Sequence, residues 1–213
     1  TTKLEGVEAF TETANGYRLE TLKILDAKGE KALNKPVGTY ITIDLEGLIE
    51  KEEGAFSRGV GLIAERLRKL MNLNKNDSVF VAGLGNSAIT PDDLGPKTAR
   101  YTMATRHLVD GLPEHFGSFR RVSVFETGVM GTTGVESAEL IAALNEKLRP
   151  NAIIAVDALA SRRLGRICRT VQIADTGITP GSGVGNARAE ITKASMGIPV
   201  YAIGVPTVVD AAT

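Results

Sequence analysis

Polar and apolar residues alternate along much of the first fifty positions of the chain. Residues 17–25 and 39–45 each follow this two-residue period, which is the pattern of half-buried β-strands. The run 26–29 between them is typical of a turn. The sequence therefore predicts an N-terminal β region, residues 1–50, that contains an antiparallel pair of strands.

The period lengthens to that of a helix after this region. Apolar residues then fall on one side of a helical wheel, with charged residues elsewhere, which predicts a helix that buries Phe56, Val60, Ile63, Leu67 and Leu70. Further along, short apolar runs predict strands at 78–82, 122–125, 152–156, 171–173 and 199–205. Between them, helices are expected to begin at Gly95-Pro96, after the capping-box pattern Thr133-Gly-Val-Glu136, and over 187–196 with Asn186 as its cap.

Apolar strands that alternate with helices indicate an α/β fold. We expect a three-layer core over residues 54–213, with a mostly parallel central sheet and helices on both faces. The length of 213 residues suits a single domain, with the N-terminal antiparallel β region attached to this core. The chain opens on Thr1 and its last residues do not resemble a natural tail, so we expect it to be truncated at both ends.

Charge and cysteine content argue against a nucleic-acid-binding, membrane-bound or disulfide-stabilised protein. The chain has 25 basic and 25 acidic residues, and this balance argues against direct binding to nucleic acid or to an anionic membrane. No apolar run approaches the length of a membrane-spanning helix. The single cysteine, Cys168, excludes an internal disulfide and fits the reducing cytoplasm.

Four polar loops follow the predicted strands. Glycine lets the backbone turn sharply and approach a ligand closely, and ligands of parallel sheets gather at the carboxyl ends of the strands. The sequence therefore predicts a functional site formed by the loops 83–96, 128–134, 157–161 and 175–186.

These loops lack good sequence patterns for dinucleotide binding and for catalysis by a serine, cysteine or histidine. The spacing Gly83-x-Gly85-x-x-Ala88 fits the weak dinucleotide pattern, but residues 89–93 interrupt the required helix and carry two carboxylates that would repel a pyrophosphate. No Gly-x-Ser-x-Gly motif occurs. We interpret Cys168 as a small core residue, and His107 and His115 as solvated or helix-end residues.

Two aspartates are the remaining candidates for chemistry. Asp92 follows the first strand of the core, and Asp157 terminates the strand 152–156. Two aspartates at the end of a parallel sheet could share a proton, one activating water and the other donating to a leaving amine. An aspartate after a strand can equally well be a turn or helix-cap residue, and the same holds for Asp93 and Asp175.

The motifs together strongly resemble the germination protease family of spore-forming bacteria. They occur in family order over most of residues 77–210, and they are Gly83-Leu-Gly-Asn86, Thr90-Pro-Asp-Asp-Leu-Gly-Pro96, Gly128-Val-Met-Gly-Thr-Thr-Gly134, Val156-Asp-Ala-Leu-Ala-Ser-Arg162, Asp175-Thr-Gly-Ile-Thr-Pro-Gly-Ser-Gly-Val-Gly-Asn186 and the segment 197–210.

This resemblance implies an endopeptidase that degrades small acid-soluble spore proteins at germination. It implies a cytoplasmic protein of the forespore and spore core, made as a zymogen that is activated by propeptide removal, homotetrameric, and without a cofactor. It further implies a fold similar to that of hydrogenase maturation endopeptidases and a catalytic pair, Asp92 and Asp157, with Asp93 placed to perturb Asp92. Family members also continue into a helical C-terminal segment beyond this chain.

The same resemblance suggests substrate-binding residues. Gly85, Asn86 and Gly131 lie in the glycine-rich loops, whose N–H groups can hold a substrate carbonyl or simply permit a turn. Family members cut beside a glutamate, so the groove should offer it a cation. Arg162 and Arg166 would share one face if their segment is helical, although a solvated basic face or an intersubunit salt bridge would look the same.

Two alternatives remain open at this stage. Asp92 and Asp157 could be ligands in a metal-dependent peptidase, although no histidine stands in a convincing matching position and we predict no metal. The chain could also be a non-catalytic sporulation protein that binds a peptide. We interpret Glu136 as the capping partner of Thr133 rather than as a catalytic acid.

Overall fold

The computed structural model describes residues 4–182, 185 and 188–209. Within them the strands are β1 (Val7–Ala14), β2 (Tyr17–Ile24), β3 (Gly38–Asp44), β4 (Val79–Leu84), β5 (Val122–Gly128), β6 (Ala152–Ser161), β7 (Thr170–Ala174) and β8 (Val200–Val209). The α-helices are α1 (Ala27–Leu33), α2 (Glu46–Ile49), α3 (Ala55–Met71), α4 (Leu94–Tyr101), α5 (Arg106–Gly111), α6 (Pro113–Phe116), α7 (Met130–Thr133), α8 (Ser137–Leu148) and α9 (Lys193–Met196). Two 3₁₀ turns are η1 (Thr90–Asp92) and η2 (Leu164–Arg166).

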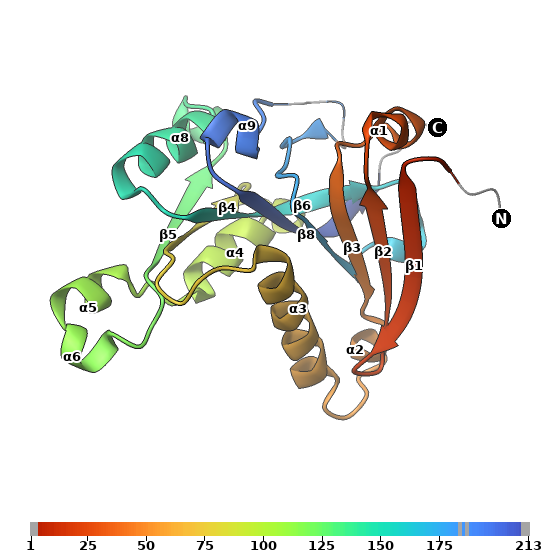
Figure 1. Ribbon diagram of the computed structural model, residues 1–213, viewed down its shortest axis with the longest axis horizontal. Helices are drawn as coiled ribbons and strands as arrows, with labels where there is room; N and C mark the ends of the chain where they lie inside the picture. Colours follow the sequence, from red (N-terminus) through yellow and green to blue (C-terminus); the bar gives the residue numbers. More distant parts are fainter. Residues whose placement is uncertain (1–3, 183–184, 186–187, 210–213) are drawn as a thin grey trace.

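The described strands form one mixed sheet in the order β1-β2-β3-β7-β8-β6-β4-β5 (Figure 1). The four strands β5, β4, β6 and β8 are parallel to one another, which confirms the predicted α/β core. The other pairings are antiparallel, including the predicted pair of β2 with β3. Since β3 pairs with β7, the N-terminal β region continues the core sheet rather than packing on it.

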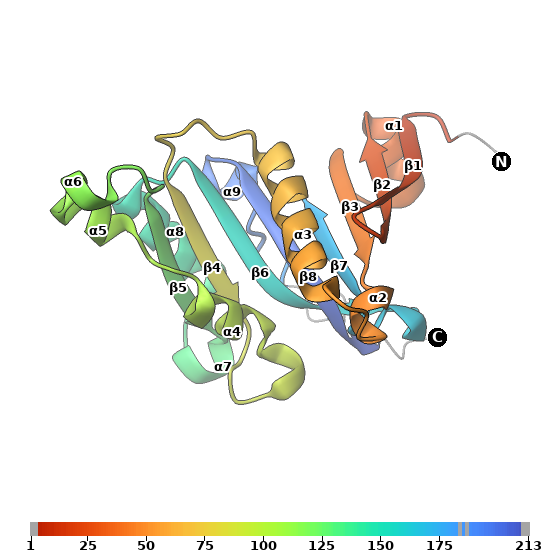
Figure 2. The same ribbon diagram turned by 90° about the horizontal axis from the view of Figure 1, so that it is seen from below.

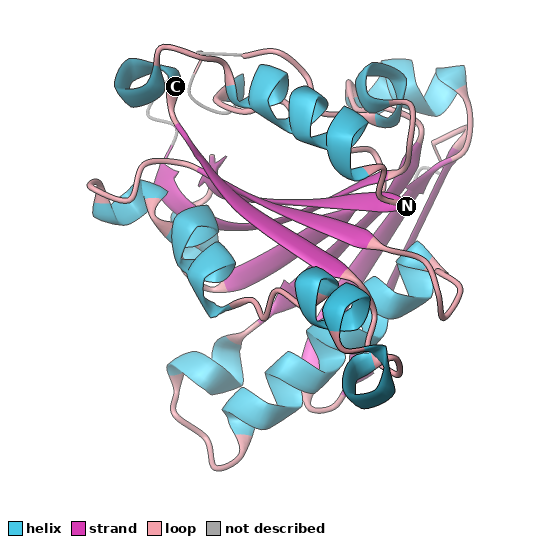
Figure 3. Ribbon diagram, turned by 90° about the vertical axis from the view of Figure 1, so that its left-hand side faces the viewer, coloured by secondary structure: helices cyan, strands magenta, loops and turns pink. Residues whose placement is uncertain are grey.

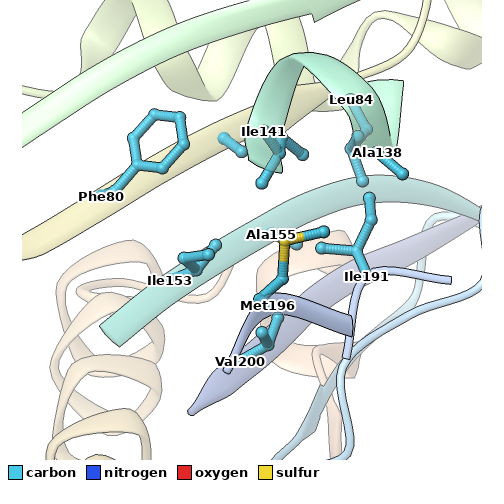
Figure 4. Close-up of a cluster of buried hydrophobic side chains, with 10 residues drawn as sticks. Phe80, Leu84, Ala138, Ile141, Ile153, Ala155, Ile191, Met196 and Val200 are labelled. Carbon is cyan, nitrogen blue, oxygen red and sulfur yellow. The ribbon is translucent and has the colours of Figure 1, made fainter. Parts of the chain in front are cut away.

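Helices cover both faces of the sheet, as predicted (Figure 3). On one face, α8 and α9 pack on alternate residues of β4 and β6, and Figure 4 shows this cluster, with Phe80, Ile153 and Ala155 facing Ile141 and Met196. On the other face, α4 covers the remaining residues of β4 and β6, and α3 packs on β2, β3 and β7 (Figure 2). The alternation of side chains in each strand thus supplies both apolar layers.

Two predictions about the first half of the chain are wrong in detail. Residues 26–29 begin the helix α1 rather than a turn, because the Asp26 carboxylate caps that helix by accepting hydrogen bonds from two backbone N–H groups. In α3 the helix is correct, and Ile63, Leu67 and Leu70 pack against the core as predicted, but the buried face is wrong in the first two turns. Phe56 and Val60 are 70% and 50% exposed, while Ala55 and Leu62 are buried. The small residues let the helix approach Tyr17, whose hydroxyl donates to the Ala55 carbonyl.

Three boundaries in the second half also differ from the prediction. Thr133 ends α7, and the helix α8 starts after Glu136, whose N–H donates to the Glu139 carboxylate at 3.2 Å. The strand β6 continues past Asp157 to Ser161 because β8 runs beside it to Val209. The last helix is only α9, because residue 191 pairs as an extended bridge with residue 178.

Two further expectations concern single residues. Cys168 is exposed in the turn between η2 and β7, so its interpretation as a core residue is wrong. Its φ of 54° belongs to the left-handed turn that redirects the chain there. The predicted helix cap Asn186 lies outside the described residues. Among the helices that the structure does describe, none combines the length and apolar character needed to cross a bilayer.

Candidate active site

A cavity of about 770 Å³ opens at the carboxyl ends of β4 and β6. Its lining comes from all four loops that the sequence singled out: the segments after β4, β5 and β7, and the second half of β6. Asp92 and Asp157 both line it. The structure therefore brings the two predicted aspartates into one cavity, at the edge of the sheet where the strand pattern placed a site.

Asp157 lies at the point where β6 stops pairing with β4. β6 pairs with β4 only up to Val156, opposite Gly83, whereas it stays paired with β8 beyond Asp157. The backbone around Asp157 is therefore held by a strand on one side and faces the cavity on the other. Its side chain lies on the face of the sheet that carries Ile153 and Ala155, and the residue is only 7% exposed.

Asp92 ends the 3₁₀ turn η1 on the opposite side of this opening. Its Oδ2 accepts a hydrogen bond of 2.8 Å from the N–H of Asn86. The turn that brings these residues together needs glycine at position 85, where φ is 117° and a Cβ atom would overlap the Asp92 carbonyl oxygen. The Gly83-Leu-Gly-Asn86 motif thus shapes the loop that positions Asp92.

The two carboxyls have different proton affinities. Burial, and after it the negative charge of Asp92, raise the pKa of Asp157 to about 7, against an opposing effect from the N–H of Ala158. Burial also raises the pKa of Asp92, but the hydrogen bond from Asn86 stabilises its carboxylate and opposes the rise. Asp157 is therefore the group that keeps a proton near neutral pH, with Asp92 as its charged neighbour.

Asp93 does not perturb Asp92 in the expected way, since the pKa of Asp92 responds to burial and to Asn86. Asp93 is buried and its Oδ2 lies 3.2 Å from Lys97 Nζ, one helical turn along α4. Among the described residues its Oδ1 has no hydrogen-bond partner. The second aspartate of the Thr-Pro-Asp-Asp motif therefore belongs to the start of α4, outside the cavity lining.

The predicted substrate-binding residues separate into two groups. Gly85 and Gly131 line the cavity, and Asn86 holds Asp92 through its N–H. Arg162 and Arg166 do not line it, and Arg166 Nη2 lies 3.5 Å from Glu20 Oε2. Their segment forms only the short turn η2, so the helix on which the two arginines would share a face is not present.

Sequence reasoning missed the one ion pair found among the described residues of the cavity. Arg188 Nη1 lies 3.4 Å from Glu136 Oε1, and both residues line the cavity. Glu136 precedes α8, as the prediction of a capping role implied, although Thr133 is not its partner. The many glycines in residues 175–186 identified that loop as part of a candidate site. No sequence pattern indicated a role for Arg188, which follows the loop.

Metal ligands are sparse in this part of the molecule. The described residues contain no group of three or more histidine, cysteine, aspartate or glutamate side chains arranged to hold a metal ion. His107 and His115 lie on α5 and α6, which follow α4 and precede β5, and neither lines the cavity. Any hard cation bound by Asp92 and Asp157 would need its other ligands from water or substrate.

Comparison with known proteins gives a consistent result. A family model described as germination protease matches residues 1–213. The germination protease of Caldanaerobacter subterraneus is 48% identical over 99% of this chain, and that of Clostridium perfringens is 45% identical over 99%. The chain spans 65% and 66% of the lengths of these two relatives. A hydrogenase maturation protease from Thermococcus kodakarensis matches 61% of this chain and 74% of its own, at 19% identity and a TM-score of 0.40.

Proposed function

The chain belongs to the germination protease family, and we propose on this premise that it is an endopeptidase that degrades small acid-soluble spore proteins during germination. The observation that carries the proposal is the pair Asp92 and Asp157 in one cavity, one of them with a pKa near 7. Paired aspartates with unequal proton affinities are what a water-activating peptidase requires.

The unequal proton affinities assign a role to each aspartate. Asp92, as the carboxylate, takes a proton from a water molecule as the water oxygen attacks the carbonyl carbon of the substrate. Asp157, as the acid, gives its proton to the leaving nitrogen when the carbon–nitrogen bond breaks. Each cycle leaves a proton on Asp92 and none on Asp157, and return of that proton to Asp157 through water restores the starting state.

Backbone N–H groups would stabilise the oxygen that becomes negative during attack. The first N–H groups of a helix have no carbonyl partner within it, and α7 begins at Met130 and Gly131, which both line the cavity. This gives Gly131 a substrate-binding role through its main chain. Gly85 and Asn86 contribute by fixing the position of Asp92.

The proposal extends to the setting in which the protein works. We place it in the cytoplasm of the forespore and the spore core, where its substrates coat DNA, and expect a zymogen activated by propeptide removal and a homotetrameric assembly. These properties follow from the family rather than from the cavity. Mass measurement in solution and N-terminal sequencing of the active form test the assembly and the processing.

The test of the activity is cleavage of a purified small acid-soluble spore protein. We expect discrete fragments, at a rate that is unchanged by a strong chelator. Cleavage that stops on chelation and returns with a divalent cation would favour the metal-dependent alternative. The absence of cleavage by the activated protein, with peptide binding retained, would favour the non-catalytic alternative.

A further inference from the structure

The strand β6 has an unpaired edge inside the cavity. It pairs with β4 only as far as Val156, whereas its pairing with β8 continues through Asp157 to Ser161 (Figure 2). Beyond Val156, β8 is thus its one neighbouring strand in the described part of the chain. Residues 158–160 of this extension line the cavity that contains the two aspartates. We call their side away from β8 the open edge.

The chain that follows β4 leaves room for another strand beside the open edge. β4 ends at Leu84, and the backbone turns away at Gly85, where φ is 117°. The segment after this turn lines the cavity through Ile89 and Asp92, and Met130 of α7 adds to the lining. The cavity of about 770 Å³ therefore takes the place beside β6 that a longer β4 would fill.

The backbone groups of β6 alternate in direction, so one set of residues bonds to β8 and the other set faces the opposite side. The set that faces β4 includes Val156, because a Cβ atom built on Gly95 would lie 2.4 Å from both the Val156 carbonyl oxygen and the Leu84 nitrogen. Ala158 and Ala160 follow Val156 at the two-residue spacing. Their N–H and C=O groups therefore point across the open edge.

These backbone groups are largely without partners. The N–H of Ala158 donates to the Asp157 carboxylate at 2.9 Å. The carbonyl of Ala158 and both backbone groups of Ala160 make no hydrogen bond to any described residue outside β8. Their side chains are single methyl groups, which leave the backbone uncovered. Unpaired N–H and C=O groups along a strand are a template for the main chain of another strand.

We infer that the substrate binds as an extended strand added to the open edge, with its main chain hydrogen-bonded to Ala158 and Ala160. This inference rests on the proposed function. Asp157 immediately precedes the open edge on the same strand, so a chain paired with that edge brings its next peptide bond to the Asp157 carboxyl. Pairing of this kind obtains affinity from the main chain, whatever the side chains of the substrate are.

The length of the open edge limits how much of the substrate is paired. A strand advances about 3.3 Å per residue, so β6 covers about 10 Å from Ala158 to Ser161, which is room for about three substrate residues. Only alternate residues of an added strand direct their N–H and C=O groups at its neighbour. The main-chain requirement should therefore follow a two-residue period on one side of the scissile bond.

Peptides with single ester bonds test this period without requiring turnover. Each peptide of the series spans a cleavage site of a small acid-soluble spore protein, and one amide is replaced by an ester, which removes one N–H and keeps every side chain. Their affinities for Asp92→Asn, which would not cut them and retains the bond between Ala158 and Asp157, are measured by fluorescence anisotropy. We expect binding about fivefold weaker at alternate positions over about three residues, and within about twofold of the parent peptide elsewhere.

Two variants in the same background assign the period to the open edge. Ala160→Pro removes an N–H that does not bond to β8, so the protein should stay folded and bind the parent peptide at least fivefold more weakly. Ala160→Ser keeps the N–H and should bind it within about twofold of the unsubstituted background. Because Ala160→Pro might unfold, the ester series stands as a separate test on an unaltered strand.

The outcomes separate this inference from the proposed function. An ester series without alternation, on peptides that the wild type cuts, overturns the inference alone. A folded Ala160→Pro that binds the parent peptide as tightly as Ala160→Ser also overturns it, and a lower mass of that variant in solution would then assign the edge to a second copy of the chain. Peptides that bind with the alternating profile but are never cut by the wild type refute the proposed function alone.

Discussion

The pKa of Asp157 makes the stability of the protein depend on pH in a way that one substitution should remove. In the unfolded chain this carboxyl has an ordinary pKa of 3.8, and in the folded protein burial and the negative charge of Asp92 together raise it to about 7. Below pH 3.8 the group is protonated in both states and contributes nothing. As the pH rises from about 4 to about 7 only the unfolded state ionises, so the folded state loses stability progressively.

The magnitude follows from the size of the shift. A rise from 3.8 to about 7 is roughly 3 pKa units, and at 1.36 kcal/mol per unit the loss amounts to about 4 kcal/mol above pH 7. Asp157→Asn keeps the shape of the side chain and cannot ionise. We therefore expect the variant to match the wild type near pH 4 and to exceed its free energy of unfolding by up to about 4 kcal/mol at pH 8.

Urea unfolding of both proteins between pH 4 and pH 8.5 measures this difference. Glu146→Gln, which neutralises an exposed carboxylate on α8, is the matched control and should give a flat difference across the range. A difference between Asp157→Asn and wild type that does not change with pH would show that Asp157 titrates normally. A wild type that is more stable than the variant above pH 7 would contradict the sign of the argument.

Three further predictions concern activity and packing. Hydrolysis should decline as the pH rises through about 7, because Asp157 loses the proton that it donates, and a kcat/KM profile from pH 5 to pH 9 that rises instead would reverse the assigned roles. Gly85→Ala should cost about 2 kcal/mol or more of stability and most of the activity, because the added Cβ overlaps the backbone of η1. The Cβ of Gly131→Ala meets no atom within 4 Å, so the free energy of unfolding of this variant in urea should lie within about 0.5 kcal/mol of wild type. Leu62→Ala should cost about 2–5 kcal/mol and Phe56→Ala less than about 0.5 kcal/mol, since the first side chain is fully buried and the second is 70% exposed; equal losses on thermal unfolding would argue for the opposite face of α3.

Hydrophobic periodicity predicted the α/β core because each core strand is a short apolar run between helical segments. It failed for the first two turns of α3, where Ala55 and Gly59 are buried and the larger Phe56 and Val60 are exposed, although Ile63, Leu67 and Leu70 pack against the core as predicted. A pattern that weighs side chains by hydrophobicity overlooks small residues that permit close approach. The choice between the two faces depended on Tyr17, 38 residues from Ala55 in the sequence, whose hydroxyl bonds to the Ala55 carbonyl.

The candidate site was predictable where it depends on strand ends. Asp92 and Asp157 follow buried strands, and parallel strands bring their carboxyl ends to one edge of the sheet. The pairing of Arg188 with Glu136 was not predictable, because it depends on how the loop after β7 folds back toward the start of α8. It leaves no local pattern in the sequence.

The central claim is that Asp92 and Asp157 act together as the catalytic pair, and cleavage by single asparagine variants tests it most directly. Initial rates on a small acid-soluble spore protein would be measured for wild type, Asp92→Asn, Asp157→Asn and the control Asp77→Asn, which lies before β4 and outside the cavity lining, with circular dichroism to verify folding. We predict that either variant of the pair loses nearly all activity, at least a hundredfold, while remaining folded, and that Asp77→Asn cleaves normally. Near wild-type turnover by a folded Asp92→Asn or Asp157→Asn would contradict the account.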